Sequence, residues 1–403
     1  MSTSMISPGL LQKRCGGWQN LRRRIIPAGC GETKASAVPR RRSLPIASGS
    51  ISGSGMTFAE RPTPLGSSCR KLVGLGVVLF SLTLLPIAAA SAASLTPDLT
   101  WPPPPNPPRI RYIQSVTGPT DLGIRRSFFG RAFGFITGQS QRIVLGRPFG
   151  VALDDQGNLL VADTSANAVF WFDLVHHNFR RWDRIGQYRL ASPVAVAVHK
   201  TTFYVADSGL SAVLAFDVKG ELRYALTNGF ERPAGLVIAG EKLFVADASA
   251  HCILVFALHG QPLARFGRRG SAPGEFNFPT HLAADANGHL IVTDSMNSRV
   301  QILDQAGHSI AVVGGAGDGS GYFSRPKGVA ADSFGHIYVA DALFDNIQVF
   351  DQEGRLLMQF GETGRQPGNF WLPGGIAISR ENRIYVADAY NRRVQIFQYV
   401  GQP

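Results

Sequence analysis

Short apolar runs separated by turn residues fill the chain from about Arg147 onward. Between Pro326 and Gly361 they read "KGVAAD", "HIYVAD", "IQVFD" and "RLLMQFG", with Gly, Asp or Asn in the turns between them. Such turn residues tolerate left-handed backbone or cap it with their own side chains. No run has the period of a helix, so the pattern predicts four short antiparallel strands. The second run is apolar on both faces, as expected of a sheet that is covered on both sides.

This four-strand pattern recurs six times. The copies begin at Pro148, Pro193, Pro233, Pro279, Pro326 and Pro373. Each contains a Val-Ala-Asp or Val-Thr-Asp sequence, whose aspartates are Asp163, Asp207, Asp247, Asp294, Asp341 and Asp388, at intervals of 44, 40, 47, 47 and 47 residues. Units of this length with four strands and no helix are typical of propeller blades. The sequence therefore predicts an all-β fold, a six-bladed β-propeller of four-stranded antiparallel blades.

The last copy has only three runs, "GIAI", "RIYVAD" and "RVQIFQ". A lone run, "RIRYIQSVTG" from Arg109 to Gly118, precedes the first copy. Aligned with "RLLMQFGETG", it places Tyr112, Ile113 and Gln114 on Leu357, Met358 and Gln359. We therefore expect Arg111–Val116 to be the fourth strand of the last blade, paired with the strand that contains Val394–Phe397. Such closure would remove a sheet edge that otherwise invites aggregation.

The copies resemble the NHL-repeat family over about residues 110–400. The linkers "GRRGSAPGEFNFP", "GGAGDGSGYFSRP" and "GETGRQPGNFWLP" share a spacing of Gly, Phe and Pro, and an Asp-x-x-Asn-x-Arg sequence occurs at Asp294 and at Asp388. Blades 1, 2, 3 and 5 depart from the Asn or the Arg, which leaves the bonding between blades open there. The resemblance implies a six-bladed propeller and does not fix a function, since members bind proteins or RNA and related propellers include lyases. The lead "WPPPPNPPRIRYIQSVTGP" also resembles that of exported bacterial propellers.

The N-terminal part has a different character. Of the 40 Lys and Arg and 28 Asp and Glu in the chain, residues 1–71 hold 12 and 2, which leaves 28 and 26 for the rest. The nearly neutral remainder argues against nucleic acid as a partner. Residues 72–93 form an apolar run after Arg70 and Lys71, and small residues end it, as in a signal peptide; an uncleaved membrane anchor is the alternative.

We accordingly expect a leader over residues 1–93, with Met56 as a possible start and a transit peptide as the alternative reading of residues 1–55. A periplasmic or extracellular location follows if the signal is cleaved, and membrane anchoring by residues 72–93 if it is not. After cleavage only Cys252 remains, so no disulfide within the chain is expected. Residues 94–109 are rich in proline, which favours an extended, semi-rigid strap before the propeller at 110–400.

One insertion breaks the repeat. Apolar residues between Ile124 and Ile136 recur at helical spacing, with basic residues on the other side. The predicted helix, near 124–136, either covers its own domain or docks on a partner or a membrane surface. Its candidate docking residues are Phe128, Phe129, Phe133, Arg125, Arg126 and Arg131.

The repeated aspartates and the glycine-rich stretch Gly314–Gly321 are interpreted as structural. A fold residue is needed in every blade, whereas a catalytic acid is needed once, and an aspartate at a strand end caps the next turn. The glycine-rich stretch lacks the Gly-Lys-Ser/Thr ending of a phosphate loop. Function is expected where the copies differ.

Two sets of residues near the blade prolines differ between copies. Two positions after the proline, His281 replaces the Gly or Ala of the other blades, and one histidine is too few for a metal site. We expect a rim histidine that is either hydrogen-bonded or exposed. Just before the proline, arginine occurs in blades 1, 3 and 5, with a lysine beside the third, which predicts a basic collar able to hold a carboxylate or phosphate. The candidate ligand-binding residues are Arg147, Arg232, His281, Arg325 and Lys327.

These features favour a non-catalytic scaffold that binds a protein, peptide or glycan at one channel face. The alternative is a lyase or hydrolase that acts at the channel mouth. We predict no catalytic residue, no metal and no cofactor, a monomer, and a possible contact with a membrane surface. A cluster of titratable groups at the mouth would favour the enzyme, and an apolar or aromatic patch would favour the scaffold.

Overall fold

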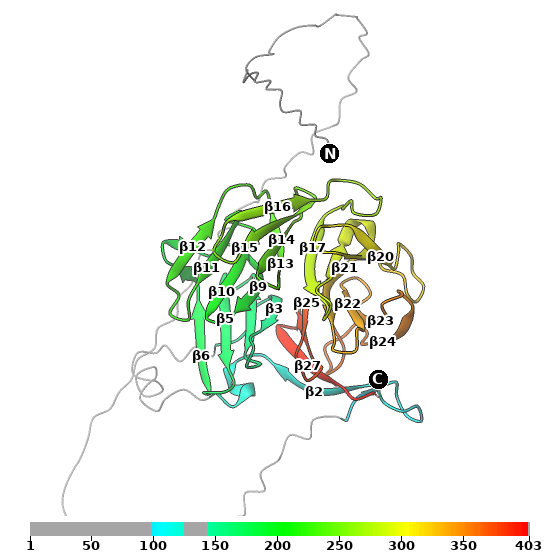
Figure 1. The fold of residues 1–403 in the computed structure, drawn as a ribbon. Helices are drawn as coiled ribbons and strands as arrows, with labels where there is room; N and C mark the ends of the chain where they lie inside the picture. The colour runs from blue at the N-terminus through cyan, green and yellow to red at the C-terminus, as the bar shows by residue number, and fades with distance from the viewer. Residues whose placement is uncertain (1–97, 125–142, 402–403) are drawn as a thin grey trace, which may run out of the picture. The chain divides into compact units, whose positions relative to one another are not determined.

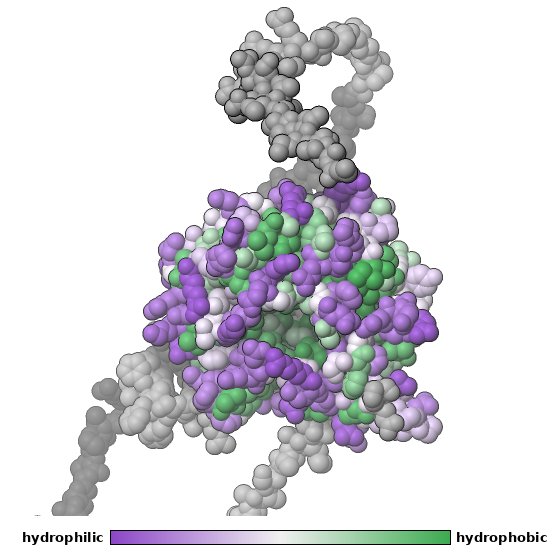
Figure 2. Space-filling model, viewed as in Figure 1, coloured by the Kyte–Doolittle hydropathy of each residue, from purple (hydrophilic) through white to green (hydrophobic). Residues whose placement is uncertain are grey.

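The chain forms a closed ring of six β-sheets. The computed structural model describes residues 98–124 and 143–401, which lie in one compact unit. The first strands of the six sheets touch one another in the order β3, β9, β13, β17, β21, β25 and back to β3, so they form the inner circle of the ring (Figure 1). Figure 2 shows a largely hydrophilic face, hollowed at the centre of the ring where apolar surface lies. The predicted six-bladed β-propeller is confirmed.

Each of blades 1–5 is a four-stranded antiparallel sheet whose strands follow one another from the channel outward. Blade 1 comprises β3 (Pro148–Leu153), β4 (Leu159–Asp163), β5 (Ala168–Asp173) and β6 (Asn178–Trp182). Blade 2 comprises β9 (Pro193–His199), β10 (Thr202–Asp207), β11 (Ala212–Phe216) and β12 (Leu222–Leu226). Blade 3 comprises β13 (Pro233–Ala239), β14 (Lys242–Asp247), β15 (Cys252–Ala257) and β16 (Pro262–Phe266).

Blade 4 comprises β17 (Pro279–Ala284), β18 (Leu290–Asp294), β19 (Arg299–Leu303) and β20 (Ser309–Val313). Blade 5 comprises β21 (Pro326–Ala331), β22 (Ile337–Asp341), β23 (Asn346–Phe350) and β24 (Leu356–Phe360). The smaller elements are the hairpin of β7 (Arg184–Ile185) and β8 (Tyr188–Arg189), and the 3₁₀ turns η1 (Pro119–Leu122) and η2 (Ser295–Asn297).

Blade 6 is closed by the beginning of the chain. Its sheet runs β25 (Pro373–Ile378), β26 (Arg383–Asp388), β27 (Arg393–Tyr399), β2 (Ile110–Val116) and β1 (Thr100–Trp101). Strand β2 pairs antiparallel with β27, from Ile110 opposite Tyr399 to Val116 opposite Val394 (Figure 1). The closure predicted from the strand count is confirmed.

The alignment that led to this prediction was wrong by one residue. Gln114 faces Ile396 in β27, and the matching pair in blade 5 is Met358 with Val349, so Gln114 corresponds to Met358 and not to Gln359. Both outer strands carry a bulge near this point. The two bulges lie at equivalent residues, Ile113 and Leu357, so they do not cause the shift. The error came from matching one glutamine to another, whereas Ser115 is the residue equivalent to Gln359.

The proline-rich segment turns back instead of running extended as predicted. The backbone N–H of Arg109 donates to the carbonyl of Trp101 at 2.8 Å, and β1 pairs with β2 as a fifth strand. The Trp101 ring lies 5.7 Å from Phe360 and 5.8 Å from Phe397, between ring centroids. The segment therefore covers the seam between blades 5 and 6. No helix among the described residues is long and apolar enough to cross a membrane.

The core lies between neighbouring sheets. All residues of β4, β18 and β22 are buried, as their two-sided apolar sequences predict. Side chains of adjacent blades form common core clusters, one of which contains Leu160 of blade 1 and Phe203 of blade 2. The outer strands β20 and β24 alternate between exposed and covered residues, because only one side of each faces the protein.

Glycine-rich linkers lead into blades 4, 5 and 6. In each, a phenylalanine is fully buried, namely Phe276, Phe323 and Phe370. Gly314 shows why the spacing is kept: its backbone is left-handed (φ 73°), and a Cβ there would collide with the Phe323 ring. The linkers are connectors, as predicted.

Candidate functional site

The six repeated aspartates are structural. All are fully buried, and each accepts hydrogen bonds from the backbone that enters its own blade. In blade 1, Asp163 accepts from the N–H of Gly146 at 2.6 Å and of Arg147 at 2.9 Å, and also from Ser165 and Ala166 in the next turn. The carboxylate thus joins the incoming linker to the turn after the second strand. The structural interpretation from the sequence is confirmed.

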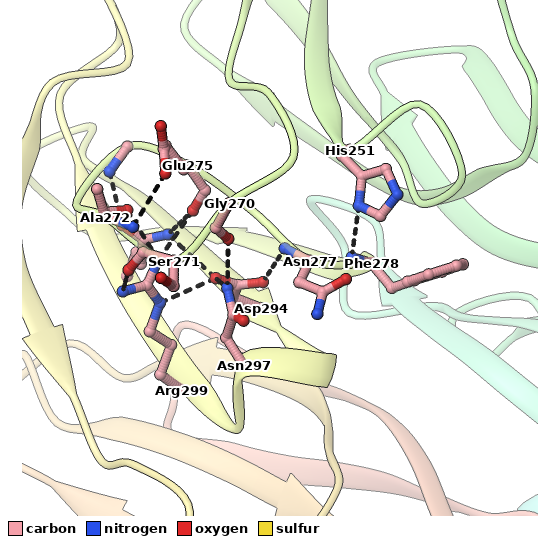
Figure 3. A network of polar contacts seen from close by, with 12 residues as sticks. His251, Gly270, Ser271, Ala272, Glu275, Asn277, Phe278, Asp294, Asn297 and Arg299 are labelled. Carbon is pink, nitrogen blue, oxygen red and sulfur yellow. Dashed lines mark hydrogen bonds and ion pairs between the residues drawn. The ribbon is translucent and has the colours of Figure 1, made fainter.

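Blades 4 and 6 use the aspartate differently. Asp294 takes only one linker N–H, that of Asn277 at 2.6 Å, while its other oxygen accepts from Asn297 at 2.8 Å and Arg299 at 2.9 Å (Figure 3). The same two side chains donate to linker carbonyls, from Asn297 to Gly270 and from Arg299 to the carbonyls of Ser271, Ala272 and Glu275. Blade 6 repeats this network with Asp388, Asn391 and Arg393.

This arrangement releases one backbone N–H for a bond between blades. The N–H of Phe278 donates to His251 Nδ1 of blade 3 at 3.2 Å (Figure 3), and that of Leu372 donates to Asp345 of blade 5 at 2.6 Å. Phe278 and Leu372 adopt left-handed backbone, with φ of 55° and 51°. His251 and Asp345 each lie four positions after the repeated aspartate of their own blade.

The residue at this position connects neighbouring blades elsewhere too. Ser211 donates to the carbonyl of Glu231 at 3.1 Å, Ser298 to that of Ser324 at 3.4 Å, and the amide of Asn167, in its favoured orientation, to that of Ala191 at 2.8 Å. Sequence reasoning missed these contacts because the side-chain type varies at this position, with Asn, Ser, His, Ser and Asp in blades 1–5. The signal that could have found them is a polar residue able to adopt left-handed backbone just before each third strand.

A cavity of about 330 Å³ lies at the end of the ring where the blade prolines are. Blades 1–5 contribute to its wall: the apolar part consists of Phe149, Val194, Ala234, Ala248, Phe278 and Met296. The polar part consists of Ser208, Thr280, Ser295, Arg232, Arg325 and Lys327. The structure thus brings three of the five predicted ligand-binding residues together, and it adds apolar neighbours that the sequence did not indicate.

The three cations of the cavity have no anionic partner. Within residues 98–124 and 143–401, no carboxylate forms an ion pair with Arg232, Arg325 or Lys327. Both arginines are exposed, so they are not sealed between blades. Burial lowers the pKa of Lys327 to about 8, and the positive charges of Arg325 and Arg232 contribute to the same shift. The three charges therefore repel one another across the cavity.

His281 adjoins this cavity and differs from the prediction. It is neither hydrogen-bonded nor exposed: it is 8% exposed, and both ring nitrogens lack a partner among the described residues. Burial lowers its pKa to about 3, with a further contribution from Lys327, so the imidazole is neutral. Its ring lies 5.5 Å from that of Phe149, between centroids. Because blades 1 and 4 stand opposite each other in the ring, these two side chains meet across the channel.

In the other blades, the position equivalent to His281 has little space for a side chain. A Cβ added to Gly235 would lie 2.7 Å from the carbonyl oxygen of Thr280, so neighbouring inner strands leave almost no room there. The Oγ1 of Thr280, beside His281, is also buried without a partner. No group of three or more His, Cys, Asp or Glu in the described part of the chain has the arrangement of a metal site.

Arg147 is not among the residues that line the cavity. Its guanidinium lies 5.1 Å from the centroid of the Tyr390 ring in blade 6. The predicted collar of three arginines is thus divided, with Arg232 and Arg325 at the cavity and Arg147 at the neighbouring rim. The predicted docking residues Arg125, Arg126, Phe128, Phe129, Arg131 and Phe133 lie outside the described residues.

A model of the NHL repeat matches residues 276–303 and 370–397. These segments are in blades 4 and 6, the two that keep both the Asn and the Arg. Among solved structures, a protein of unknown function from Bacteroides thetaiotaomicron aligns with a TM-score of 0.51 and 15% identity, over 63% of this chain and 70% of that one. A streptogramin B lyase gives 0.49 and 11%, over 63% and 94%. Kuenenia stuttgartiensis hydrazine synthase gives 0.48 and 14%, over 67% and 100%. At such identities the likeness concerns the fold alone.

Proposed function

Since the chain is an NHL-repeat protein folded as a six-bladed propeller, we propose that it is a non-catalytic scaffold that binds an anionic group of its partner at one channel mouth. The observation that carries this proposal is the trio Arg232, Arg325 and Lys327 around one cavity, unpaired within the described residues. Like charges held close together cost folding stability, and a bound anion would offset that cost.

The wall of the cavity also indicates the form of the ligand. Guanidinium groups offer paired donors that match carboxylate and phosphate, and the apolar wall would hold an aromatic or aliphatic body next to the charge. His281 adds no charge here, because its buried imidazole is neutral. An organic anion, or an acidic group on a larger partner, fits this combination.

Phenyl phosphate is a suitable probe because it joins a dianion to an aromatic ring. Titration calorimetry of the chain at pH 7.5 should show binding of phenyl phosphate and none of benzylamine. Arg232→Ala or Arg325→Ala should weaken binding about tenfold or more, the usual effect of losing a charge-assisted hydrogen bond. Arg223→Ala is the matched control, because Arg223 bonds to Thr201 and Thr202 at the opposite end of blade 2. Equal binding by all variants, or no binding at all, would overturn the proposal.

The second candidate is a lyase or hydrolase at the same mouth. The observation that favours it is Lys327, since an amine with a pKa near 8 is suited to general-base catalysis. A panel of p-nitrophenyl esters and phosphates tests it. Hydrolysis that rises through pH 8 and disappears in Lys327→Met would favour the enzyme over the scaffold.

Export remains part of the proposal. It rests on the apolar run at residues 72–93, with basic residues before it and small residues after it. Sequencing the N-terminus of the protein from cell fractions tests it: a periplasmic form that begins shortly after Ala92 supports cleavage, and an intact chain in the membrane fraction supports the anchor.

A further inference from the structure

The rim of the channel mouth differs between the two halves of the ring. Two positions after the repeated aspartate, blades 1–3 carry Ser165, Gly209 and Ser249. At the same position, blades 4–6 carry Met296, Leu343 and Tyr390. These three side chains are 52%, 54% and 47% exposed. All follow a second strand whose last residue pairs with a blade proline, so they lie at the same end of the ring as the cavity.

Trp371 extends this set. It is 37% exposed, and its ring lies 5.8 Å from that of Tyr390. Arg365 lies 5.0 Å from the centroid of the Trp371 ring, and Arg147 covers Tyr390. The result is a row of two rings with a guanidinium group at each end. Met296, Leu343, Trp371 and Tyr390 are called the rim crescent below.

The rim crescent continues into the cavity, because Met296 belongs to both. Its neighbours are positively charged, with Arg147 and Arg365 at one end and Arg325 and Lys327 in the cavity. None of these four side chains forms an ion pair with a described carboxylate. Large apolar side chains gathered around an opening are unusual on a soluble surface and mark interaction sites.

We infer that the rim crescent docks a polypeptide segment of a partner that combines acidic and apolar side chains, with one carboxylate in the cavity. The inference rests on the proposed anion-binding function and names the partner class. Exposed Trp, Tyr, Met and Arg together are the composition enriched at protein interfaces. The flexible Met296 and the aliphatic Leu343 suit apolar peptide side chains, whereas a sugar would find few hydrogen-bonding groups on this arc. The positive surroundings require negative charge on the segment.

A phage-displayed library of random dodecapeptides, selected on the full chain, supplies the probe. The enriched peptides should contain both acidic and apolar residues. For a synthetic copy of the most enriched peptide, Trp371→Ser with Tyr390→Ser should raise the dissociation constant about tenfold or more, and Leu343→Ser alone should raise it about threefold or more. The control is Ile310→Ser with Val312→Ser, which removes two similarly exposed apolar side chains from the outer strand β20. It should leave the peptide affinity within about twofold.

Phenyl phosphate separates the two possible failures. If phenyl phosphate binds the cavity but no peptide is enriched, or if the peptide binds the crescent variants as tightly as the wild type, the docking inference is wrong and the anion site stands. If neither probe binds, both fall. Enriched peptides that lack acidic residues would also overturn the inference. So would a result in which the crescent variants lose binding of a polyuronate or of anionic vesicles but still bind the peptide.

Discussion

Blades 1–3 and blades 4–6 have the same backbone but hold it together differently. In blades 4–6, a buried glutamine seven positions after the aspartate clamps the incoming linker: Gln301, Gln348 and Gln395 each accept from a linker glycine N–H and donate to a linker carbonyl. In blades 1–3, the same position is Phe170, Leu214 and Leu254. The first half therefore fixes its linkers by the aspartate and apolar contact, and the second half adds a polar network.

The side chains at the rim of the channel mouth also differ between blades 1–3 and blades 4–6. The half with glutamine-clamped linkers also carries the exposed Met296, Leu343 and Tyr390, whereas the other half carries small residues there. Linkers held by buried hydrogen bonds give exposed side chains above them a fixed base, which lowers the entropy lost on binding. The comparison teaches that repeats differing at two positions can give the two halves of one ring different linker bonding and different rim surfaces.

The largest effect is expected from Arg393→Met in blade 6. Arg393 is 8% exposed and donates to the fully buried Asp388 at 2.7 Å, and burial already raises the pKa of that carboxyl. Removing one partner of a buried pair leaves an unpaired charge, so unfolding in urea should show a loss of about 3–5 kcal/mol. Arg355→Met breaks the pair of the exposed Arg355 with Asp351 and should change the free energy of unfolding far less. Equal losses would mean that the network of blade 6 does not support its half of the ring.

The next effect comes from making blade 5 resemble blade 2. Gln348→Leu introduces the residue that blade 2 has at this position, Leu214. It orphans the N–H of Gly321 and the carbonyl of Tyr322, which should cost about 2–4 kcal/mol in the same urea assay. Conversely, Leu214→Gln buries an amide where no linker partner is provided. If Gln348→Leu left the free energy of unfolding unchanged, the buried glutamines would not stabilise blades 4–6.

Lys327→Met should increase stability while weakening anion binding. The pKa of Lys327 falls from an ordinary 10.5 to about 8 in the folded chain, so the unfolded chain holds more protons between these values. The penalty is therefore fully present below pH 8 and is relieved as the pH rises toward 10.5. At pH 7 the substitution should stabilise by about 1–3 kcal/mol in thermal unfolding, and the gain should shrink above pH 8.

The affinity for phenyl phosphate should follow the same residue. In the wild type it should fall between pH 7 and pH 9 as Lys327 loses its charge, whereas the Lys327→Met variant should show a lower affinity that hardly changes over this range. A pH profile that is the same in both proteins would place the anion elsewhere.

The smallest effect is expected from Leu343→Ser. Leu343 is 54% exposed, so its loss should change the free energy of unfolding by less than about 0.5 kcal/mol. A larger loss in urea unfolding would show that the rim crescent supports the fold, and its exposure would then give no argument for docking.

Much of the fold was predictable because it depends on repetition and counting. The spacing of the aspartates gave six blades, and the missing strand of blade 6 gave the pairing of β2 with β27. The register was not predictable, because the shared glutamine suggested an alignment in which Gln114 matched Gln359, whereas Ser115 is the equivalent residue. The contacts of His251 and Asp345 were hidden because the side-chain type at their repeat position varies between blades.

The site was predictable only in part. Arg232, Arg325 and Lys327 come together because repeat positions map onto ring positions. Arg147 holds the same repeat position, yet it stacks on Tyr390, since that ring exists only in blade 6. The burial of His281 against Phe149 joins opposite blades, a contact that no local pattern reveals.

The pairing of Ile110–Val116 with Arg393–Tyr399 also sets the order of events during protein synthesis. At bacterial or eukaryotic elongation rates, roughly tens of seconds separate the emergence of these two strands from the ribosome. During that time β2 lacks β27, and only the short strand β1 is available to pair with it. One edge of β2 is therefore open to pairing with other chains until the last blade is made.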